Sequence, residues 1–185
     1  MRKFWQIIQF TTFAFMTQWS FMSAAQAKGV LPELENMPTL SAQAEQAKRP
    51  ILLLFSAEWC EYCELLQEYV LNPMQLSGLY DDYVFLRHVG IDIAGEIVDW
   101  QGRKFKDKAA WAYHLNADLT PTVLFVDGQG REIAQRIVGI SEVTLFPLLV
   151  HERLNDAYKN LGLELRIPST PEKLELLQHS NSNND

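Results

Sequence analysis

The stretch Ser56-Ala-Glu-Trp-Cys60-Glu-Tyr-Cys63-Glu-Leu-Leu66 contains both cysteines of the 185-residue chain. It follows an apolar run over residues 51–55 and leads into a helical pattern over residues 64–71. We therefore expect the cysteine pair at a junction between a strand and a helix. The first thiol then lies at a helix N-terminus, where free N–H groups and the helix dipole favour a thiolate. The second lies one turn further on the same face and can reach back to form a disulfide.

Three kinds of site are compatible with a Cys-x-x-Cys pair. A zinc site normally needs a second pair of cysteines or histidines at ligand spacing, and the sequence contains none. A structural disulfide is an alternative, but closing so short a loop restricts the unfolded chain only slightly. A redox-active dithiol fits the strand-to-helix position best, and the local sequence leaves the other two open.

The composition is that of a soluble globular protein, with 48% hydrophobic and 21% charged residues. The formal net charge of −7 argues against nucleic acid and anionic membrane surfaces as partners. Four histidines are scattered through the chain, and none adjoins the cysteines: His88, His114, His151 and His179. We therefore expect no metal, no bound cofactor and no catalytic histidine.

Residues 1–27 have the features of an export signal. Arg2 and Lys3 form a basic start, an apolar stretch follows, and Ala25-Gln26-Ala27 matches a signal-peptidase site. Cleavage leaves Lys28–Asp185, 158 residues with a charge of −9 because two cations and no anions are removed. That length is enough for one domain with a full core. We expect export to the periplasm, where disulfides persist.

The alternative to a cleaved signal is an uncleaved membrane anchor. Polar residues interrupt the apolar stretch, namely Gln6, Gln9, Thr11, Thr12, Thr17, Gln18 and Ser20. Buried glutamine is costly in hydrocarbon, so a cleaved signal is the preferred interpretation. No later segment of the sequence has the length of a transmembrane helix.

The order of predicted elements follows from apolar periodicity and turn residues. We expect helices over residues 39–48 (capped by Thr39 or Ser41), 61–72 with an irregular turn to residue 80, 108–115, 141–159 and 173–177. We expect strands over residues 51–55, 83–91, 122–126 and 131–138, the last two joined by the turn Asp127–Gly130. Residues Asp92–Asp107 form a long connection, and residues 180–185 a disordered tail.

This order predicts an α/β fold. Strands separated by helices favour parallel pairing through right-handed crossovers, and the final hairpin adds an antiparallel strand. We expect a central mixed four-stranded sheet with helices on both faces. The predicted domains are a signal peptide (residues 1–27), an irregular lead-in (28–38), an α/β domain (39–162) and a C-terminal extension with a short helix (163–185). We expect no internal repeat.

Four segments together resemble the thioredoxin superfamily: Phe55–Cys63, Leu119-Thr-Pro-Thr-Val-Leu-Phe125, Asp127-Gly-Gln-Gly130 and Ile137-Val-Gly139. The resemblance extends over roughly residues 40–161, most of the mature chain, and implies a thioredoxin-like fold. Within the superfamily, Ala44–Lys48 and the Asp92–Asp107 insertion look like the exported branch that includes the SoxW-type proteins.

The resemblance also implies roles for site residues. Cys60 is expected to be the nucleophile and Cys63 the buried resolving thiol. The Thr120–Pro121 bond is expected to be cis, with the Thr120 backbone facing an extended substrate segment that it pairs with. Trp59 is expected to shield the disulfide from one side. The alternative for Pro121 is a proline that merely begins a strand. The alternative for Trp59 is ordinary packing, which is compatible with shielding.

One position departs from the family pattern. Thioredoxins usually have a buried acid six residues before the first cysteine, which accepts the proton of the resolving thiol; here the residue is Leu54. Because leucine cannot accept a proton, Cys63 must lose its proton by another route. Glu58 and Glu61 are candidates through water, although as surface carboxylates they are more simply explained by solvation.

The residues between the cysteines also affect the expected direction of electron transfer. The Glu61 carboxylate opposes a Cys60 thiolate while the helix N-terminus favours it, each by an order of 1 kcal/mol or less when exposed. We therefore expect only a modestly lowered pKa for Cys60. A less stabilised thiolate means a less oxidising disulfide, so the potential should lie nearer thioredoxin than the strong periplasmic oxidant.

The sequence thus predicts an exported, monomeric thiol–disulfide oxidoreductase that reduces protein disulfides. A membrane electron-donor protein is implied as a partner, because an exported compartment supplies no soluble dithiol. The alternatives are a disulfide oxidase or isomerase, and a non-catalytic binding module whose disulfide is only structural.

Overall fold

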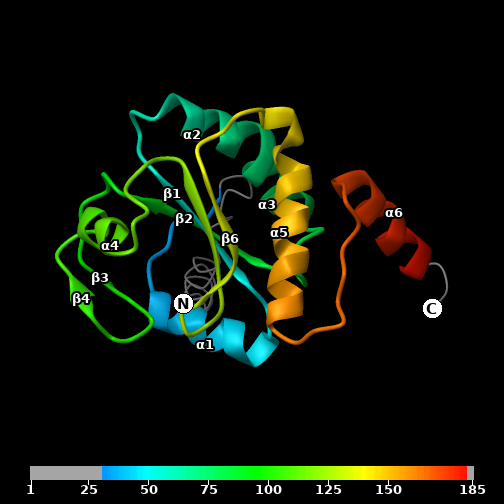
Figure 1. Cartoon of the computed structure of the whole chain (residues 1–185), viewed down its shortest axis with the longest axis horizontal. Helices are drawn as coiled ribbons and strands as arrows, with labels where there is room; N and C mark the ends of the chain where they lie inside the picture. Colours follow the sequence, from blue (N-terminus) through cyan, green and yellow to red (C-terminus); the bar gives the residue numbers. More distant parts are fainter. Residues whose placement is uncertain (1–30, 183–185) are drawn as a thin grey trace, which may run out of the picture.

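A mixed four-stranded sheet forms the centre of the computed structural model, which describes residues 31–182 (Figure 1). Its strands are β1 (Ile51–Ser56), β2 (Phe85–Gly90), β5 (Thr122–Val126) and β6 (Glu132–Val138), in the order β2-β1-β5-β6. The β1 and β2 strands are parallel, whereas β5 is antiparallel to both β1 and β6. The predicted mixed sheet is confirmed.

Helices cover both faces of this sheet, as predicted (Figure 1). One face is covered by α2 (Glu61–Leu66), α3 (Asn72–Ser77) and α5 (Phe146–Asn160), whose side chains share an apolar core with Leu52 and Leu54 of β1. The other face is covered by α1 (Met37–Ala47) and α4 (Lys108–His114), which pack on Ile51, Leu53 and Phe55. Every β1 side chain is buried, which explains its continuous apolar sequence.

The first helix begins earlier than predicted. Asn36, rather than Thr39 or Ser41, is its N-cap, and the Asn36 side chain accepts a hydrogen bond of 2.9 Å from the Thr39 N–H. Pro38 lies in the first turn, where a missing N–H costs no hydrogen bond. The helix ends at Lys48, whose φ of 52° lies in the left-handed region.

The helix that follows the cysteines changes character along its length. It continues from α2 through a π-helical segment, Gln67–Leu71, into α3, and Gly78 (φ 68°) ends it. Pro73 lies in the first turn of α3, where its missing N–H costs no helical hydrogen bond.

The predicted helix over residues 141–159 is wrong at its start. Val143–Leu145 form a 3-10 turn, and α5 proper begins at Phe146, so that Pro147 falls in its first turn.

The C-terminal extension contains a longer helix than predicted. Helix α6 spans Pro171–Ser182, so the prediction of a disordered tail is wrong for residues 180–182; residues 183–185 lie outside the described range. The buried side chain of Leu174 holds this helix against the core.

The Asp92–Asp107 insertion contains a small hairpin that the sequence analysis did not predict. Its strands are β3 (Ile97–Val98) and β4 (Lys104–Phe105), which pair antiparallel. Ile97 is buried in the core beneath α1 and α4.

The predicted signal peptide, residues 1–27, lies outside the described residues. Among the helices formed by residues 31–182, none is long and apolar enough to span a bilayer.

Candidate active site

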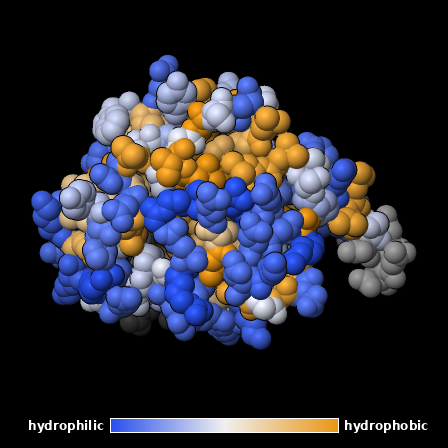
Figure 2. All heavy atoms as spheres, in the orientation of Figure 1, coloured by the Kyte–Doolittle hydropathy of each residue, from blue (hydrophilic) through white to orange (hydrophobic). Residues whose placement is uncertain are grey.

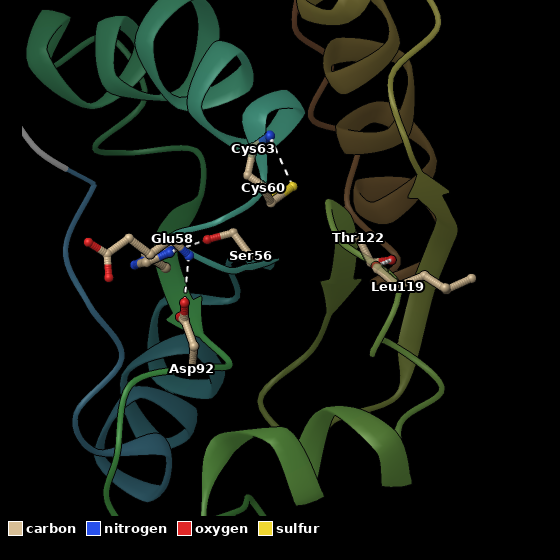
Figure 3. The surroundings of a disulfide bond; sticks show 8 residues. Ser56, Glu58, Cys60, Cys63, Asp92, Leu119 and Thr122 are labelled. Atoms are coloured by element: carbon tan, nitrogen blue, oxygen red, sulfur yellow. Dashed lines mark hydrogen bonds between the residues drawn. A yellow bond between two sulfur atoms is a disulfide. The ribbon is translucent and has the colours of Figure 1, made fainter.

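The two cysteines lie at the junction of β1 and α2 and are joined by a disulfide, with 5.2 Å between their Cα atoms. Cys60 is the N-cap of α2, and its sulfur accepts a hydrogen bond of 3.3 Å from the Cys63 N–H (Figure 3). This N–H belongs to the first helical turn and also donates to the Cys60 carbonyl at 2.9 Å. The fold therefore places a sulfur acceptor where the helix N-terminus stabilises negative charge.

The two sulfur-bearing residues differ in their exposure. Cys60 is 8% exposed and Cys63 only 1%; together with Ala57 they form a small buried cluster against which Ile91 packs. Trp59 is 74% exposed, so most of its ring is in solvent rather than against the protein. Ile91, the residue directly after β2, packs against the cluster that contains the two cysteines, and no motif in the sequence pointed to it.

The loop between β1 and α2 is fixed by the segment that follows β2. The Glu58 N–H donates to Asp92 Oδ2 at 2.6 Å, and the Ile91 N–H donates to the Ser56 carbonyl at 2.8 Å (Figure 3). The Glu58 carboxylate itself is exposed. The hydrogen bond from the Glu58 N–H to the Asp92 carboxylate is charge-assisted, and such a bond is roughly twice as strong as a neutral one. Asp92 therefore helps to hold the loop that leads into Cys60.

The Thr120–Pro121 segment lies at the same end of the sheet as the cysteines. Thr122, which follows it, pairs with Phe55 near the end of β1, and the Thr120–Pro121 peptide bond is cis. The Thr122 hydroxyl donates to the Leu119 carbonyl at 2.5 Å, and Figure 3 shows both residues across from the disulfide. The fold thus brings the predicted site residues Cys60, Cys63, Thr120 and Pro121 to one end of the sheet.

An open groove of about 440 Å³ lies beside Cys60. Ala57 and Cys60 form part of its lining, and three carboxylate side chains, Glu58, Glu64 and Glu68, form much of the rest. No lysine or arginine is among its lining residues. Over the range 31–182, no three histidine, cysteine, aspartate or glutamate side chains are grouped so that they could hold a metal ion.

A second polar cluster lies on β1 and β2 close to this site. The Ser56 hydroxyl hydrogen-bonds to His88 Nε2, and His88 Nδ1 contacts Glu33 Oε2 at ion-pair distance. The Lys108 ammonium pairs with the other oxygen of Glu33, which also accepts a hydrogen bond of 3.1 Å from the Gly90 N–H. The sequence analysis missed this cluster, because its members lie far apart in the chain and no motif links them.

The charges in this cluster determine the ionisation of its carboxyl group. Burial raises the pKa of Glu33, but hydrogen bonds from His88 and Lys108 and the charge of His88 outweigh that effect, so the pKa lies below its ordinary value. Glu33 is therefore an anion at neutral pH, which leaves it able to accept a hydrogen bond from His88.

The chain is similar to a known domain family and to several known proteins. The model of the thioredoxin-like domain family matches residues 38–150. The thiol:disulfide interchange protein DsbD of Salmonella typhi is 28% identical over 144 residues, which are 75% of this chain and 23% of that protein. DsbD of Escherichia coli K12 is 27% identical over 124 residues, 65% of this chain and 20% of that protein. The chain thus spans only about a fifth to a quarter of the length of these relatives.

Thioredoxins are among the solved structures that are similar to this chain. Thioredoxin NaTrxh from Nicotiana alata is 19% identical with a TM-score of 0.46 and covers 70% of this chain and 97% of its own. Spinach chloroplast thioredoxin f is 17% identical with the same TM-score of 0.46 and covers 70% and 94%. The family model covers 113 of the 185 residues, more than half of the sequence, and the chain therefore belongs to the thioredoxin-like domain family.

Proposed function

We propose that this protein is a thiol–disulfide oxidoreductase that reduces disulfides of other proteins by dithiol exchange. The observation that carries the proposal is the inequality of the two cysteines: Cys60, the more exposed of the two at 8%, caps α2 and accepts a hydrogen bond from the Cys63 N–H, while Cys63 is 1% exposed. A purely structural disulfide does not need one sulfur at a helix N-terminus with its partner shielded. The family and its relatives, whose printed name is thiol:disulfide interchange protein, support the same chemistry.

The proposed reaction has two exchange steps. The Cys60 thiolate attacks one sulfur of the substrate disulfide; that S–S bond breaks, and the first substrate sulfur leaves as a thiolate that takes up a proton. The Cys63 thiolate then attacks Cys60 Sγ in the mixed disulfide and releases the second substrate sulfur. Two electrons pass from the dithiol to the substrate, and the protein ends with the Cys60–Cys63 disulfide.

The surroundings of the dithiol support a protein as the substrate. Trp59, Tyr62 and Leu119 expose large apolar surfaces close to the disulfide in sequence or in space. Figure 2 shows further apolar side chains gathered over the ends of β5 and β6 and the start of α5. An extended substrate segment can pair with the Thr120 backbone and cover these side chains.

Export and the electron source are further parts of the proposal. Residues 1–27 are proposed to direct the protein to the periplasm and to be cleaved, and a membrane protein is proposed to reduce the disulfide again after each turnover. We also propose that the chain is of the exported, SoxW-type kind within the thioredoxin superfamily. The mass of the protein recovered from the periplasm tests cleavage after Ala27: a full-length mass, or recovery only from the cytosol, would contradict it.

Insulin reduction by the purified protein tests the main proposal. With dithiothreitol as electron donor, the wild type should accelerate insulin precipitation, and Cys60→Ser should abolish the acceleration. Cys63→Ser should instead accumulate a mixed disulfide with insulin. Activity that survives Cys60→Ser would leave the disulfide as a structural feature of a binding module, and net oxidation of reduced substrates would favour an oxidase.

A further inference from the structure

Two rows of side chains run toward the disulfide. One lies on strand β1 and the other on the helix that covers this face of the sheet. Alternate residues of a strand share one face, so Leu52, Leu54 and Ser56 form the row on β1. Leu52 and Leu54 lie in the same apolar core as Leu66 and Val70, which share a helical stripe with Cys63. Ser56 and Cys63 are therefore the members of each row nearest the β1–α2 junction.

His88 enters this face from the neighbouring strand. The β1–β2 register places His88 directly beside Leu54, and paired residues of parallel strands point to the same side. The hydrogen bond between His88 Nε2 and the Ser56 hydroxyl shows that these two side chains meet on that side. The imidazole thus lies next to the position where thioredoxins usually have a buried acid and this chain has leucine.

Ser56 links the imidazole to the site. Its side chain is buried at the end of β1, and its carbonyl accepts the N–H of Ile91, which packs against the cluster formed by Ala57 and the two cysteines. Figure 3 shows Ser56 immediately below the disulfide. A hydroxyl both donates and accepts a hydrogen bond, so it can pass a proton from one side to the other.

We propose that His88, acting through the Ser56 hydroxyl, accepts the proton of the Cys63 thiol during the second exchange step. The inference rests on the proposed function and deepens it by assigning the proton acceptor that Leu54 cannot supply. It replaces the expectation that no histidine takes part, and it assigns the proton to His88 instead of to the candidates Glu58 and Glu61.

The proposed step balances in protons and electrons. In the mixed disulfide, the Ser56 hydroxyl gives its proton to His88 Nε2 and takes the proton of Cys63. The Cys63 thiolate attacks Cys60 Sγ, the bond between Cys60 and the substrate sulfur breaks, and the Cys60–Cys63 bond forms. The departing substrate thiolate takes a proton from solvent, and the imidazolium returns its proton to solvent afterwards.

Charged groups lie on one side of His88. The Glu33 carboxylate contacts Nδ1, and the Lys108 ammonium of α4 pairs with the same carboxylate. Arg87 precedes His88 on β2, and its guanidinium hydrogen-bonds to the Leu86 carbonyl at 2.7 Å. Strand β1 contributes no charged group, since its six residues are Ile51-Leu-Leu-Leu-Phe-Ser56.

The first experiment measures the pH profile of the buried thiol alone. In Cys60→Ser, Cys63 is the single thiol, and the rate of its alkylation by iodoacetamide follows its ionisation. Adding His88→Gln should move the midpoint of this profile to higher pH by about one pH unit. Ser56→Ala, a smaller change that keeps both charged partners of the cluster, should shift it in the same direction.

The second experiment follows the step itself in the full protein. In single-turnover mixing with a model protein disulfide, His88→Gln should slow release from the mixed disulfide at pH 7 about a hundredfold. Formation of the mixed disulfide, measured in the Cys63→Ser background, should be unchanged by the same substitution. The matched control is His179→Gln on the exposed side of α6, which should alter neither step.

The outcomes separate this inference from the proposed function. An alkylation midpoint unmoved by both His88→Gln and Ser56→Ala overturns the relay even if insulin reduction depends on Cys60. Insulin reduction that is independent of Cys60 overturns the proposed function even if the midpoint moves. If His88→Gln fails to fold, judged by circular dichroism, Ser56→Ala decides the question.

Discussion

At the scale of single residues, the ionisation of Cys60 depends on opposing charges. The Cys63 N–H and the start of α2 favour a thiolate, while Glu61 and Glu64 in the first turn oppose it. The carboxylates of the neighbouring groove add to the opposing charge. These opposing charges are the physical basis of the expectation of a reducing rather than a strongly oxidising dithiol, which stays a prediction.

We predict that Glu61→Gln makes the disulfide more oxidising. Removing the adjacent carboxylate should lower the pH midpoint of the Cys60 thiolate absorbance by up to about one pH unit and raise the reduction potential by about 10–30 mV. Equilibration with glutathione gives the potential, and the wild type should lie below about −150 mV. Glu164→Gln, at an exposed site in the C-terminal extension, is the control. A change no larger than that of the control would contradict the prediction.

His151 is a buried titratable residue away from the dithiol. Its Nε2 lies 2.7 Å from the Tyr80 hydroxyl, and its Nδ1 lies 2.6 Å from the Pro168 carbonyl oxygen. Burial lowers the pKa of His151, although the Pro168 carbonyl and the charge of Glu172 partly offset it. The imidazole is therefore held neutral, donating at Nδ1 and accepting at Nε2.

We predict an acid-dependent loss of stability that originates at His151. Its folded pKa lies below the unfolded value of about 6.5, so the unfolded chain binds the proton first. Stability is then full above pH of about 6.5 and falls as the pH drops toward the folded pKa. Urea unfolding at pH 7.5 and 5.5 should show that the free energy of unfolding falls less between these pH values for His151→Gln than for the wild type. An equal fall in the two proteins would refute the assignment.

At the scale of elements, two turns of the same construction pack together. Residues 99–103 and 127–131 share the sequence Asp-x-Gln-Gly-Arg. In each, the aspartate Oδ1 accepts hydrogen bonds of 2.9 Å from the N–H groups two and four residues further on, and Oδ2 accepts one from the arginine Nε. The expectation of no internal repeat is wrong at the scale of these five residues. In both turns the aspartate side chain accepts hydrogen bonds from backbone N–H groups of the turn.

We predict that the two turn glycines differ in their tolerance of alanine. Gly102 and Gly130 have φ of 78° and 79°, so alanine is strained at both by about 1–2 kcal/mol. A Cβ on Gly130 would also overlap the ring of Trp100, whereas Gly102 has open space. In urea unfolding, Gly130→Ala should therefore cost more stability than its matched control Gly102→Ala. Equal losses would mean that Trp100 moves aside freely.

The sequence was informative about these elements to different degrees. Strands such as β1 and β5 were predictable because they are short apolar runs between punctuating residues. The β3–β4 hairpin was not, because its strands have two residues each and are too short to show alternation. The Asp-x-Gln-Gly-Arg sequence at residues 99–103 did indicate the β3–β4 hairpin, but only through its similarity to the distant turn at residues 127–131.

At the scale of the whole molecule, the C-terminal extension is part of the domain core. The Ile167 and Leu174 side chains are buried among residues of α5 and the sheet. Asn155 of α5 accepts the Ile167 N–H and donates to its carbonyl, both at 2.9 Å. The Gln178 amide donates to the Leu79 carbonyl at 2.9 Å. Helix α6 is thus fixed against the body of the protein at several points (Figure 1).

We predict that Leu174→Ala destabilises the whole protein. Leu174 is 1% exposed, and truncating a buried leucine costs about 2–5 kcal/mol. Leu176, on the same helix, is 68% exposed, so Leu176→Ala is the matched control and should change stability little. One cooperative urea transition at a lower midpoint is the expected result. An unchanged transition would show that α6 is dispensable to the core.

Long-range contacts explain most of what sequence reasoning missed. The Cys60–Cys63 pair and Thr120–Pro121 could be chosen as site residues because each is a contiguous motif. The Ser56–His88–Glu33 cluster could not, since it depends on the β1–β2 register and on a segment that was read as irregular lead-in. The docking of Leu174 likewise depends on tertiary packing that a short amphipathic pattern does not specify.

The lead-in before α1 also closes an open edge of the sheet. The His88 N–H donates to the Pro32 carbonyl at 2.8 Å, and the Leu34 N–H donates to the His88 carbonyl at 2.7 Å, along the outer side of β2. Unpaired strand edges are templates for association with other chains. A shortened protein that begins at Met37 would expose this edge and is expected to form aggregates in which β2 strands pair between molecules.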